Sequence, residues 1–228
     1  MRTSSLGLLK LTSFIRSLRF LPPLFAAGVI LVILYASTGQ ASASGFADSA
    51  ALLFPVYAWT SRQLLDTDPD EQEQLGAVAL GGRAASVATG VATAALSCCF
   101  VLAVAIAWPL ARGAFSPTPS AGEIATGVGV HCCMLVAAVA VGAVSSRASV
   151  GSGAAGLLTL VGVSLISLLI GLTHVPTLAW VVPPLDDVVR AGYEGSSRLT
   201  AALPFVAIRS ILWTAAALGL YAWRRRSL

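Results

Sequence analysis

Long apolar runs separated by short polar stretches dominate this chain of 228 residues. A helix crosses the roughly 30 Å of membrane hydrocarbon with about 20 mostly apolar residues. Six runs approach or exceed this length, and the second, which contains Pro55, reaches it only by extending through residues 61–65. The six runs occupy residues 20–37, 46–60, 84–111, 124–144, 154–173 and 203–223. We therefore expect an all-α integral membrane protein with six transmembrane helices in one domain, residues 20–228.

Residues 1–19 show a different pattern, in which apolar and basic positions alternate at helical spacing. Leu8, Leu11, Ile15 and Leu18 recur at steps of three or four, and basic residues lie between them. This pattern is typical of a helix that lies on the membrane surface. We expect an amphipathic interfacial helix over 1–19, with Lys10 and Arg16 directed toward the lipid headgroups. No convincing cleavage site follows it, so we expect it to be retained.

The composition supports a membrane protein and excludes several other classes. Apolar residues make up 57% of the chain and charged residues 11%, against about 45–50% and about 25% in soluble proteins. These values exclude a soluble enzyme, a nucleic-acid reader and a disordered linker. Thirteen of the fourteen basic residues are Arg, and Lys10 is the only Lys. Together with the abundance of Ala, Val and Gly, this suggests a GC-rich bacterial host.

The basic residues are unevenly divided between the two sides of the predicted membrane domain. Ten lie on the side of the N-terminus and three, Arg112, Arg190 and Arg198, on the other. Because Lys and Arg are enriched in cytoplasmic loops, we expect both termini in the cytoplasm and the chain in the bacterial plasma (inner) membrane. The ten residues are Arg2, Lys10, Arg16, Arg19, Arg62, Arg83, Arg147, Arg224, Arg225 and Arg226.

The cytoplasmic loop 61–82 is longer than a hairpin between two spans requires. Asp68 can cap a helix, Pro69 suits its first position, and Glu71 stands where a capping-box acid reaches back. Gly81 and Gly82 then end it. We expect a helix over about 69–80 at the cytoplasmic mouth, and it is either a docking element for a cytoplasmic partner or a solvated loop with a frayed helix.

Further residues of this loop fit the docking interpretation. Asp70, Glu71 and Glu73 favour the positive end of the helix dipole, and Leu75 begins a more apolar second half. Asp66, Asp68 and Asp70 alternate as in a calcium loop, but the required Gly and distal Glu are missing. No second acidic cluster completes a magnesium site either, so we expect no metal and no cofactor.

A second long connection, predicted to be external, covers residues 174–202. Prolines interrupt it, and residues 184–190 can form a short helix that ends at Ala191 and Gly192. Trp180, Val181 and Val182 are apolar for a loop in water. They fit a stretch that dips into the membrane boundary or packs against the spans, although a mobile external loop is the alternative.

Ionisable and soft side chains at membrane depth are candidates for function. Arg209 either reaches the outer headgroups or forms an inter-helix ion pair, for which Glu123, Asp186 and Asp187 are possible partners. His131 lies near mid-depth and is a possible pathway or inter-helix residue. Neighbouring positions on a helix point about 100° apart, so the pairs Cys98-Cys99 and Cys132-Cys133 are poorly placed to chelate a metal and fit structural filling better.

The order of these parts resembles the membrane (permease) subunit of a type-2 ATP-binding-cassette (ABC) transporter. The layout covers the whole chain, from the basic surface helix to the terminal Arg224-Arg225-Arg226. At residue level the resemblance lies in LLDTDPDEQ at 64–72 followed by GGR at 81–83, which looks like the cytoplasmic loop of small actinobacterial permeases of this kind. The external segment is short for the family and has no globular domain.

The resemblance implies that residues 69–80 form a coupling helix, which sits in a groove of the ATPase subunit. The ATPase must be a separate chain, because no Walker motif is present. The second permease half would be another copy or a homologous chain. The chain itself would perform no bond chemistry. The residues implied in coupling are Arg62, Asp68, Asp70, Glu71, Glu73, Leu75 and Arg83.

Two function classes remain open at this point. The first is the permease subunit of an ABC exporter that moves a hydrophobic or amphipathic substrate by alternating access. The second is a non-transport membrane scaffold, or accessory subunit, of a larger complex. A capped helix directed at an ATPase favours the exporter, since a scaffold has no need of one. Neither class predicts a nucleic-acid partner.

Overall fold

The computed structural model describes residues 2–173 and 180–226, without the side chains of Arg2, Asp70, 171–173 and 225–226. Apart from one isolated bridge between Gln40 and Phe115, every element in this part is a helix. The expected all-helical fold is therefore confirmed. Residues 174–179, which begin the predicted external segment and include His174, lie outside the described residues.

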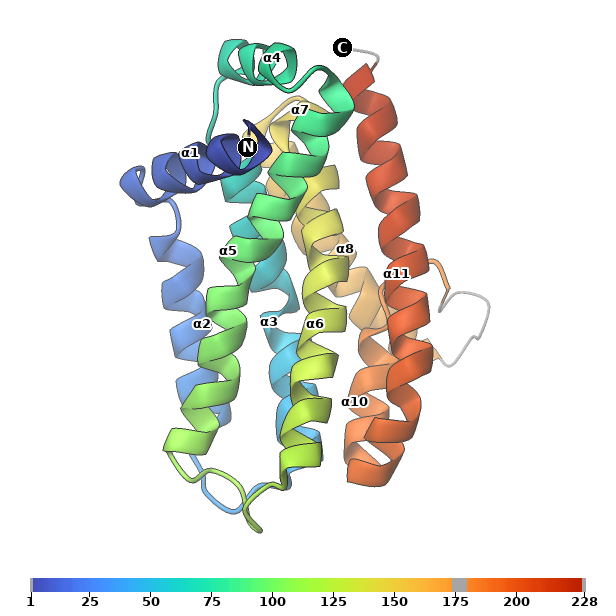
Figure 1. The fold of residues 1–228 in the computed structure, drawn as a ribbon. Helices are drawn as coiled ribbons and strands as arrows, with labels where there is room; N and C mark the ends of the chain where they lie inside the picture. The colour runs from blue at the N-terminus through green and yellow to red at the C-terminus, as the bar shows by residue number, and fades with distance from the viewer. Residues whose placement is uncertain (1, 174–179, 227–228) are drawn as a thin grey trace.

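Six helices form an upright bundle, and the other described helices lie across or beside it (Figure 1). The bundle helices are α2 (Leu21–Leu34), α3 (Ser42–Leu65), α5 (Arg83–Ala111), α6 (Ala121–Val144), α8 (Gly153–Thr173) and α11 (Ser196–Arg226). The helices across or beside them are α1 (Arg2–Arg16), α4 (Asp70–Ala79), α7 (Arg147–Val150) and α10 (Leu185–Tyr193).

Four of the described helices are long and apolar enough to cross a membrane, namely α5, α6, α8 and α11. They correspond to the third to sixth predicted spans. The start of α6 is fixed by a capping box, in which Ser120 accepts from the Glu123 backbone and the Glu123 carboxylate accepts from Ser120. These four helices identify a membrane protein.

The first predicted span differs from the structure. Helix α2 has 14 residues, which rise about 21 Å, less than the roughly 30 Å of hydrocarbon. Its axis is bent by 74° from that of α1 across a short break. Helices α1 and α2 together count as a fifth candidate membrane span only when they are taken as one broken span. Pro22 and Pro23 lie in the first turn of α2. Proline lacks the N–H that a continuing helix needs, so these two residues favour a new helix after the break rather than an extension of α1.

Helix α3, the second predicted span, is long enough at 24 residues but falls below the apolarity of the other four. It lies in the middle of the bundle and packs against α2, α5, α6 and α10. Its large side chains Phe46, Phe54 and Tyr57 are fully buried. A helix surrounded by protein can carry polar residues such as Ser49, because few of its side chains face lipid.

Glycines bring α6 close to α3. A Cβ on Gly142 would lie 2.6 Å from the carbonyl oxygen of Ala58, and one on Gly127 would lie 2.7 Å from the ring of Phe46. Small residues at such positions allow helix backbones to approach closely within a membrane bundle.

Both ends of the described chain lie at the same end of the bundle, together with α1, α4 and α7 (Figure 1). The links from α2 to α3 and from α5 to α6 lie at the opposite end, as does the start of α11. Arg112 and Arg198 therefore lie far from Arg62, Arg83 and the C-terminal arginines. The basic residues that the sequence assigns to opposite sides of the membrane therefore lie at opposite ends of the bundle.

The short helix α10 packs against the bundle rather than projecting from it. Its residues Leu185 and Val188 are fully buried, and it contacts α3, α8 and α11. Gly192 makes this possible, since a Cβ there would lie 3.0 Å from the carbonyl oxygen of Ala43. Of the apolar residues before it, Val182 is buried, whereas Trp180 and Val181 are more than half exposed.

Candidate functional site

Helix α4 lies across the end of the bundle that carries both chain ends (Figure 1). It covers Asp70–Ala79, one residue shorter at each end than the predicted 69–80. Its N-cap is Pro69, and no side chain caps it, so the expectation that Asp68 caps the helix is wrong. The reason is that Asp68 is bound elsewhere. Gly81, at φ +81°, ends the helix, and the Gly82 N–H donates to the Ala77 carbonyl over 2.9 Å.

Lys10 of α1 holds the inner side of α4. Its Nζ lies 2.6 Å from Oδ2 of Asp68 and 3.7 Å from Oε1 of Glu73. Only 7% of Lys10 is exposed, so the expectation that it faces the headgroups is wrong. Leu6, one turn earlier, packs against Gly76 of α4. The only lysine of the chain therefore fixes α1 to α4.

Asp66 joins several elements beneath α4, just after the end of α3. Its carboxylate accepts from the Arg147 backbone N–H over 2.8 Å and lies 3.5 Å from Arg62. Its carbonyl accepts from Arg19 and from the Arg147 guanidinium. Burial raises the pKa of the Asp66 carboxyl above 3.8, and the hydrogen bond and the arginines offset this only in part.

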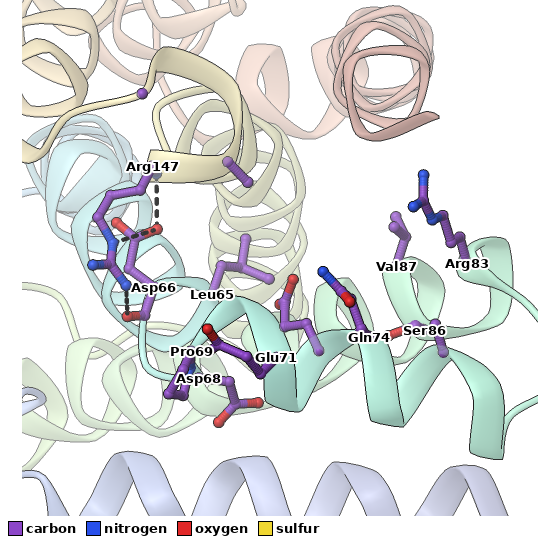
Figure 2. Close-up of a pocket in the computed structure, with 14 residues that line it drawn as sticks. Leu65, Asp66, Asp68, Pro69, Glu71, Gln74, Arg83, Ser86, Val87 and Arg147 are labelled. Atoms are coloured by element: carbon purple, nitrogen blue, oxygen red, sulfur yellow. Dashed lines mark hydrogen bonds and ion pairs between the residues drawn. The ribbon is translucent and has the colours of Figure 1, made fainter. Parts of the chain in front are cut away.

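A cleft of about 620 Å³ opens between α4, the start of α5 and α7. Figure 2 shows Asp66 and Arg147 on one side, with α4 and the start of α5, which carries Arg83, on the other. The charged residues that line it are Asp66, Asp68, Glu71, Glu73, Arg83 and Arg147. Three of the four carboxylates are compensated by neighbouring cations, since Asp68 and Glu73 pair with Lys10 and Asp66 lies beside Arg62 and Arg147.

The outer side of α4 combines acid and apolar residues. Glu71 is exposed, and the apolar side chains of Leu75 and Val78 are 71% and 81% exposed. This helix lies beyond the long apolar helices. Exposed apolar side chains rimmed by polar groups are typical of protein interaction surfaces.

The structure divides the predicted coupling residues into two groups. Asp68 is buried and Glu73 is partly buried beside Lys10, so these two connect α4 to α1. Arg62 is also buried, but it binds Asp66 and the Gly153 carbonyl rather than α4. Glu71, Leu75 and Arg83 are exposed. The side chain of Asp70 lies outside the part that the structure describes.

Lys10, Asp66 and Arg147 belong to this site and were not predicted for it. Lys10 pairs with an acid 58 residues away, and helical periodicity does not show such a distant partner. The one available signal was that Lys10 is the single lysine in an arginine-rich chain.

Arg209 lies at a separate place in the bundle, between α10 and α11. It is 5% exposed, so it does not reach the headgroups. Its Nη1 forms an ion pair with Asp187 and its Nη2 donates to the Val182 carbonyl. Its guanidinium carbon also lies 5.4 Å from the centre of the Trp180 ring. Arg209 therefore ties the segment before α10, and α10 itself, to α11.

His131 is fully buried between α3 and α6. Its Nδ1 lies 2.8 Å from the Gly127 carbonyl and its Nε2 3.2 Å from Oγ of Ser49. Since a carbonyl only accepts, Nδ1 carries the proton, and Nε2 accepts from the Ser49 hydroxyl. The Tyr35 hydroxyl lies 3.0 Å from the same Oγ. The group links three helices, and no solvent-accessible surface reaches His131 or Ser49.

The four cysteines lie in different surroundings. Cys98 is buried, where its thiol donates to the Tyr57 carbonyl, whereas Cys99 and Cys132 are exposed. Among the described residues, no three His, Cys, Asp or Glu side chains gather as a metal would require.

In comparisons with known proteins, the chain matches no family model, no curated protein and no solved structure.

Proposed function

We propose that this chain is the permease subunit of an ATP-driven ABC exporter, with α4 as the element that contacts a separate ATPase chain. One observation carries the proposal. Helix α4 lies at the end of the bundle, is fixed by its inner side through Lys10, and presents Glu71, Leu75 and Val78 outward. The resemblance of residues 64–72 and 81–83 to a permease loop supports the same role.

A coupling element must be exposed to its partner and firmly connected to the spans. On the inner side, Asp68 and Glu73 pair with Lys10, while Asp66 joins Arg62 and Arg147. A push on α4 would therefore reach α1, α3 and α7 together. In the proposed cycle, closure of the ATPase moves α4, and the spans of two permease halves rock apart.

The proposal includes six crossings with both termini in the cytoplasm of a bacterial inner membrane. Helices α2 and α3 would supply the first two crossings, in addition to the four apolar helices. The division of basic residues between the two ends supports this orientation. Thiol labelling of single cysteines placed at residues 118 and 228, in a variant without native cysteines, tests it. A membrane-impermeant reagent should label only residue 118 in intact cells, and labelling of residue 228 would overturn the orientation.

The transported substrate would be hydrophobic or amphipathic. The described long helices carry few charged residues, and Arg209 is paired with Asp187.

Two halves are required, because one chain supplies only half of the twelve spans that this transporter class uses. The second half is a copy of this chain or a homologous permease.

A pull-down from mild detergent tests the central claim. Tagged wild type is compared with the double variant Glu71→Arg/Leu75→Arg, in which both changed side chains are exposed. The matched control is Glu194→Arg, an exposed acid at the opposite end of the bundle. Captured chains are identified by mass spectrometry.

We expect a chain with a Walker motif to co-purify with wild type and the control, and to be lost from the double variant. If wild type captures no ATPase, or captures membrane proteins that the double variant retains, the exporter proposal fails. The scaffold interpretation then takes its place.

A further inference from the structure

A groove of about 520 Å³ runs between α5 and α11, near the end that carries both chain ends. Apart from Arg83, every residue that lines it is Ala, Val, Leu or Gly. Ala88 and Ala92 of α5 and Gly219 of α11 are exposed along it. The groove exists because these positions carry too little side chain to fill the space between the two helices.

The groove opens toward the surroundings of the bundle at membrane depth. Both of its walls are helices that are long and apolar enough to cross a membrane, so its natural surroundings are lipid chains. It follows α5 from Arg83 to Ala95, a helical rise of about 18 Å. This length is close to one leaflet, which is about half of the roughly 30 Å of hydrocarbon.

The width of the groove decides which kind of occupant fits. Spread over about 18 Å, its volume corresponds to a cross-section of about 30 Å². A whole helix, about 10 Å across with its side chains, is wider than such a space and could only lay side chains along it. A single hydrocarbon chain fits the space, and it meets only apolar walls below Arg83.

Only one end of the groove is charged. Arg83 is exposed and is the first residue of α5, so its guanidinium lies at the end of the groove nearest the membrane surface. Trp223 is 64% exposed on α11 at the same end, as is typical of side chains at the headgroup level. An amphipathic occupant would be oriented with an anionic group at Arg83 and its chain directed toward Ala95.

We propose that this groove binds one anionic phospholipid, with one acyl chain between α5 and α11 and its phosphate at Arg83. Guanidinium–phosphate contacts are charge-assisted and strong, but both kinds of headgroup carry a phosphate. The cationic group of a zwitterionic headgroup is repelled by the Arg83 guanidinium, so the site selects a net anionic headgroup. The binding needs no ATPase, and it is therefore independent of the proposed function.

Native mass spectrometry of the full chain, released from nanodiscs, tests the site. The probes are dioleoyl phosphatidylglycerol, which is anionic, and dioleoyl phosphatidylcholine, which is zwitterionic with the same chains. We expect wild type to retain one phosphatidylglycerol and to prefer it about tenfold, as one like-charge contact between Arg83 and the choline group allows. Arg83→Gln should remove this preference.

Two variants fill the groove from opposite walls. Ala88→Phe acts from α5, and Gly219→Leu acts from α11, where a Cβ meets no atom within 4 Å. Both should lose the retained lipid of either headgroup. The matched controls are Leu158→Phe, on the exposed side of α8, and Arg112→Gln, at the opposite end of α5. Both controls should bind as wild type does.

Three results would overturn the proposal. The first is equal retention of the two lipids by wild type, and the second is unchanged retention in both filled variants. The third is loss of dimers in the filled variants with lipid retention intact, which would make the groove a contact between copies of this chain. Size-exclusion profiles identical to wild type establish that each variant is folded.

Discussion

The Nζ of Lys10 lies 2.6 Å from Oδ2 of Asp68, and both side chains are more than nine-tenths buried. This ion pair joins the helix at the start of the chain to the segment that leads into α4. Removing one member of a buried pair leaves the other charge without compensation, which costs about 3–5 kcal/mol.

The two members of this pair should respond differently to substitution. Lys10→Met leaves Asp68 and Glu73 buried side by side, whereas Asp68→Asn leaves Lys10 within 3.7 Å of Glu73. We expect Lys10→Met to lower the thermal midpoint in detergent more than Asp68→Asn does. The double variant Lys10→Met/Asp68→Asn should be less destabilised than the sum of the two. Strict additivity would show that the pair contributes nothing.

Gly142 should not tolerate even a methyl group. A Cβ there would lie 2.6 Å from the Ala58 carbonyl oxygen and 3.0 Å from the backbone nitrogen of Arg62, so α6 would have to move away from α3. We expect Gly142→Ala to cost about 1–3 kcal/mol, as overpacking does.

Gly28→Ala is the matched control for this substitution, because nothing lies within 4 Å of a Cβ in the middle of α2. Alanine is favoured over glycine inside a helix by about 1 kcal/mol. Thermal unfolding should therefore move in opposite directions for the two variants. A shift of the same sign would contradict the close approach of α6 to α3.

The pH dependence of stability should reveal the burial of Asp66. Its pKa is raised in the folded protein above the 3.8 of an unfolded aspartate, so between these two values the folded state binds more protons. The contribution of Asp66 to the free energy of unfolding therefore falls as the pH rises from about 4 through the pKa of Asp66 in the folded protein.

Asp66→Asn carries a neutral side chain at every pH and provides the comparison. The thermal midpoint of wild type, relative to this variant, should be lower at pH 7 than at pH 4. The opposite trend would mean that Arg19, Arg62 and Arg147 together outweigh the cost of burying the carboxylate.

The contacts of Arg209 should decide how firmly α10 is held. Arg209→Met removes the pair with Asp187 and the hydrogen bond to the Val182 carbonyl, at a cost of about 1–3 kcal/mol. Hydrogen–deuterium exchange should rise across residues 185–193. Arg209→Lys should give partial protection, because lysine keeps the charge but lacks the forked geometry.

Arg198→Met is the matched control for Arg209→Met. Arg198 is exposed and, among the described residues, pairs with Glu194 one turn away; such pairs contribute about 0.3–0.5 kcal/mol. Exchange across α10 should stay at the wild-type level. Equal effects of the two variants would contradict a specific anchor at Arg209.

The apolar runs predicted the four candidate membrane-spanning helices well, because a helix that crosses lipid must be apolar along most of its length. Turn residues also predicted α4 and its end at Gly81 and Gly82 to within one residue. Both signals are local, so they can be read from neighbouring positions in the sequence.

Contacts between distant residues could not be predicted in this way. The partner of Lys10 lies 58 residues away, and only the packing of α1 across α4 and α5 brings the two together. The same limit applies to Ser49 and His131, which are 82 positions apart. The chain offered the residue types at the site but no pattern that paired them.

The burial of α3 has a consequence for how the protein is made. This helix falls below the apolarity of the four candidate membrane spans, and it packs against α6 and α10, which are synthesised later. If α3 is the second span, as proposed, insertion one helix at a time in order of translation would leave the face of α3 that packs on α6 and α10 without its cover. On that arrangement, the early part of the chain would stay near the insertion machinery until α6 arrives, and a nascent chain released before residue 144 would lack the surface that covers α3.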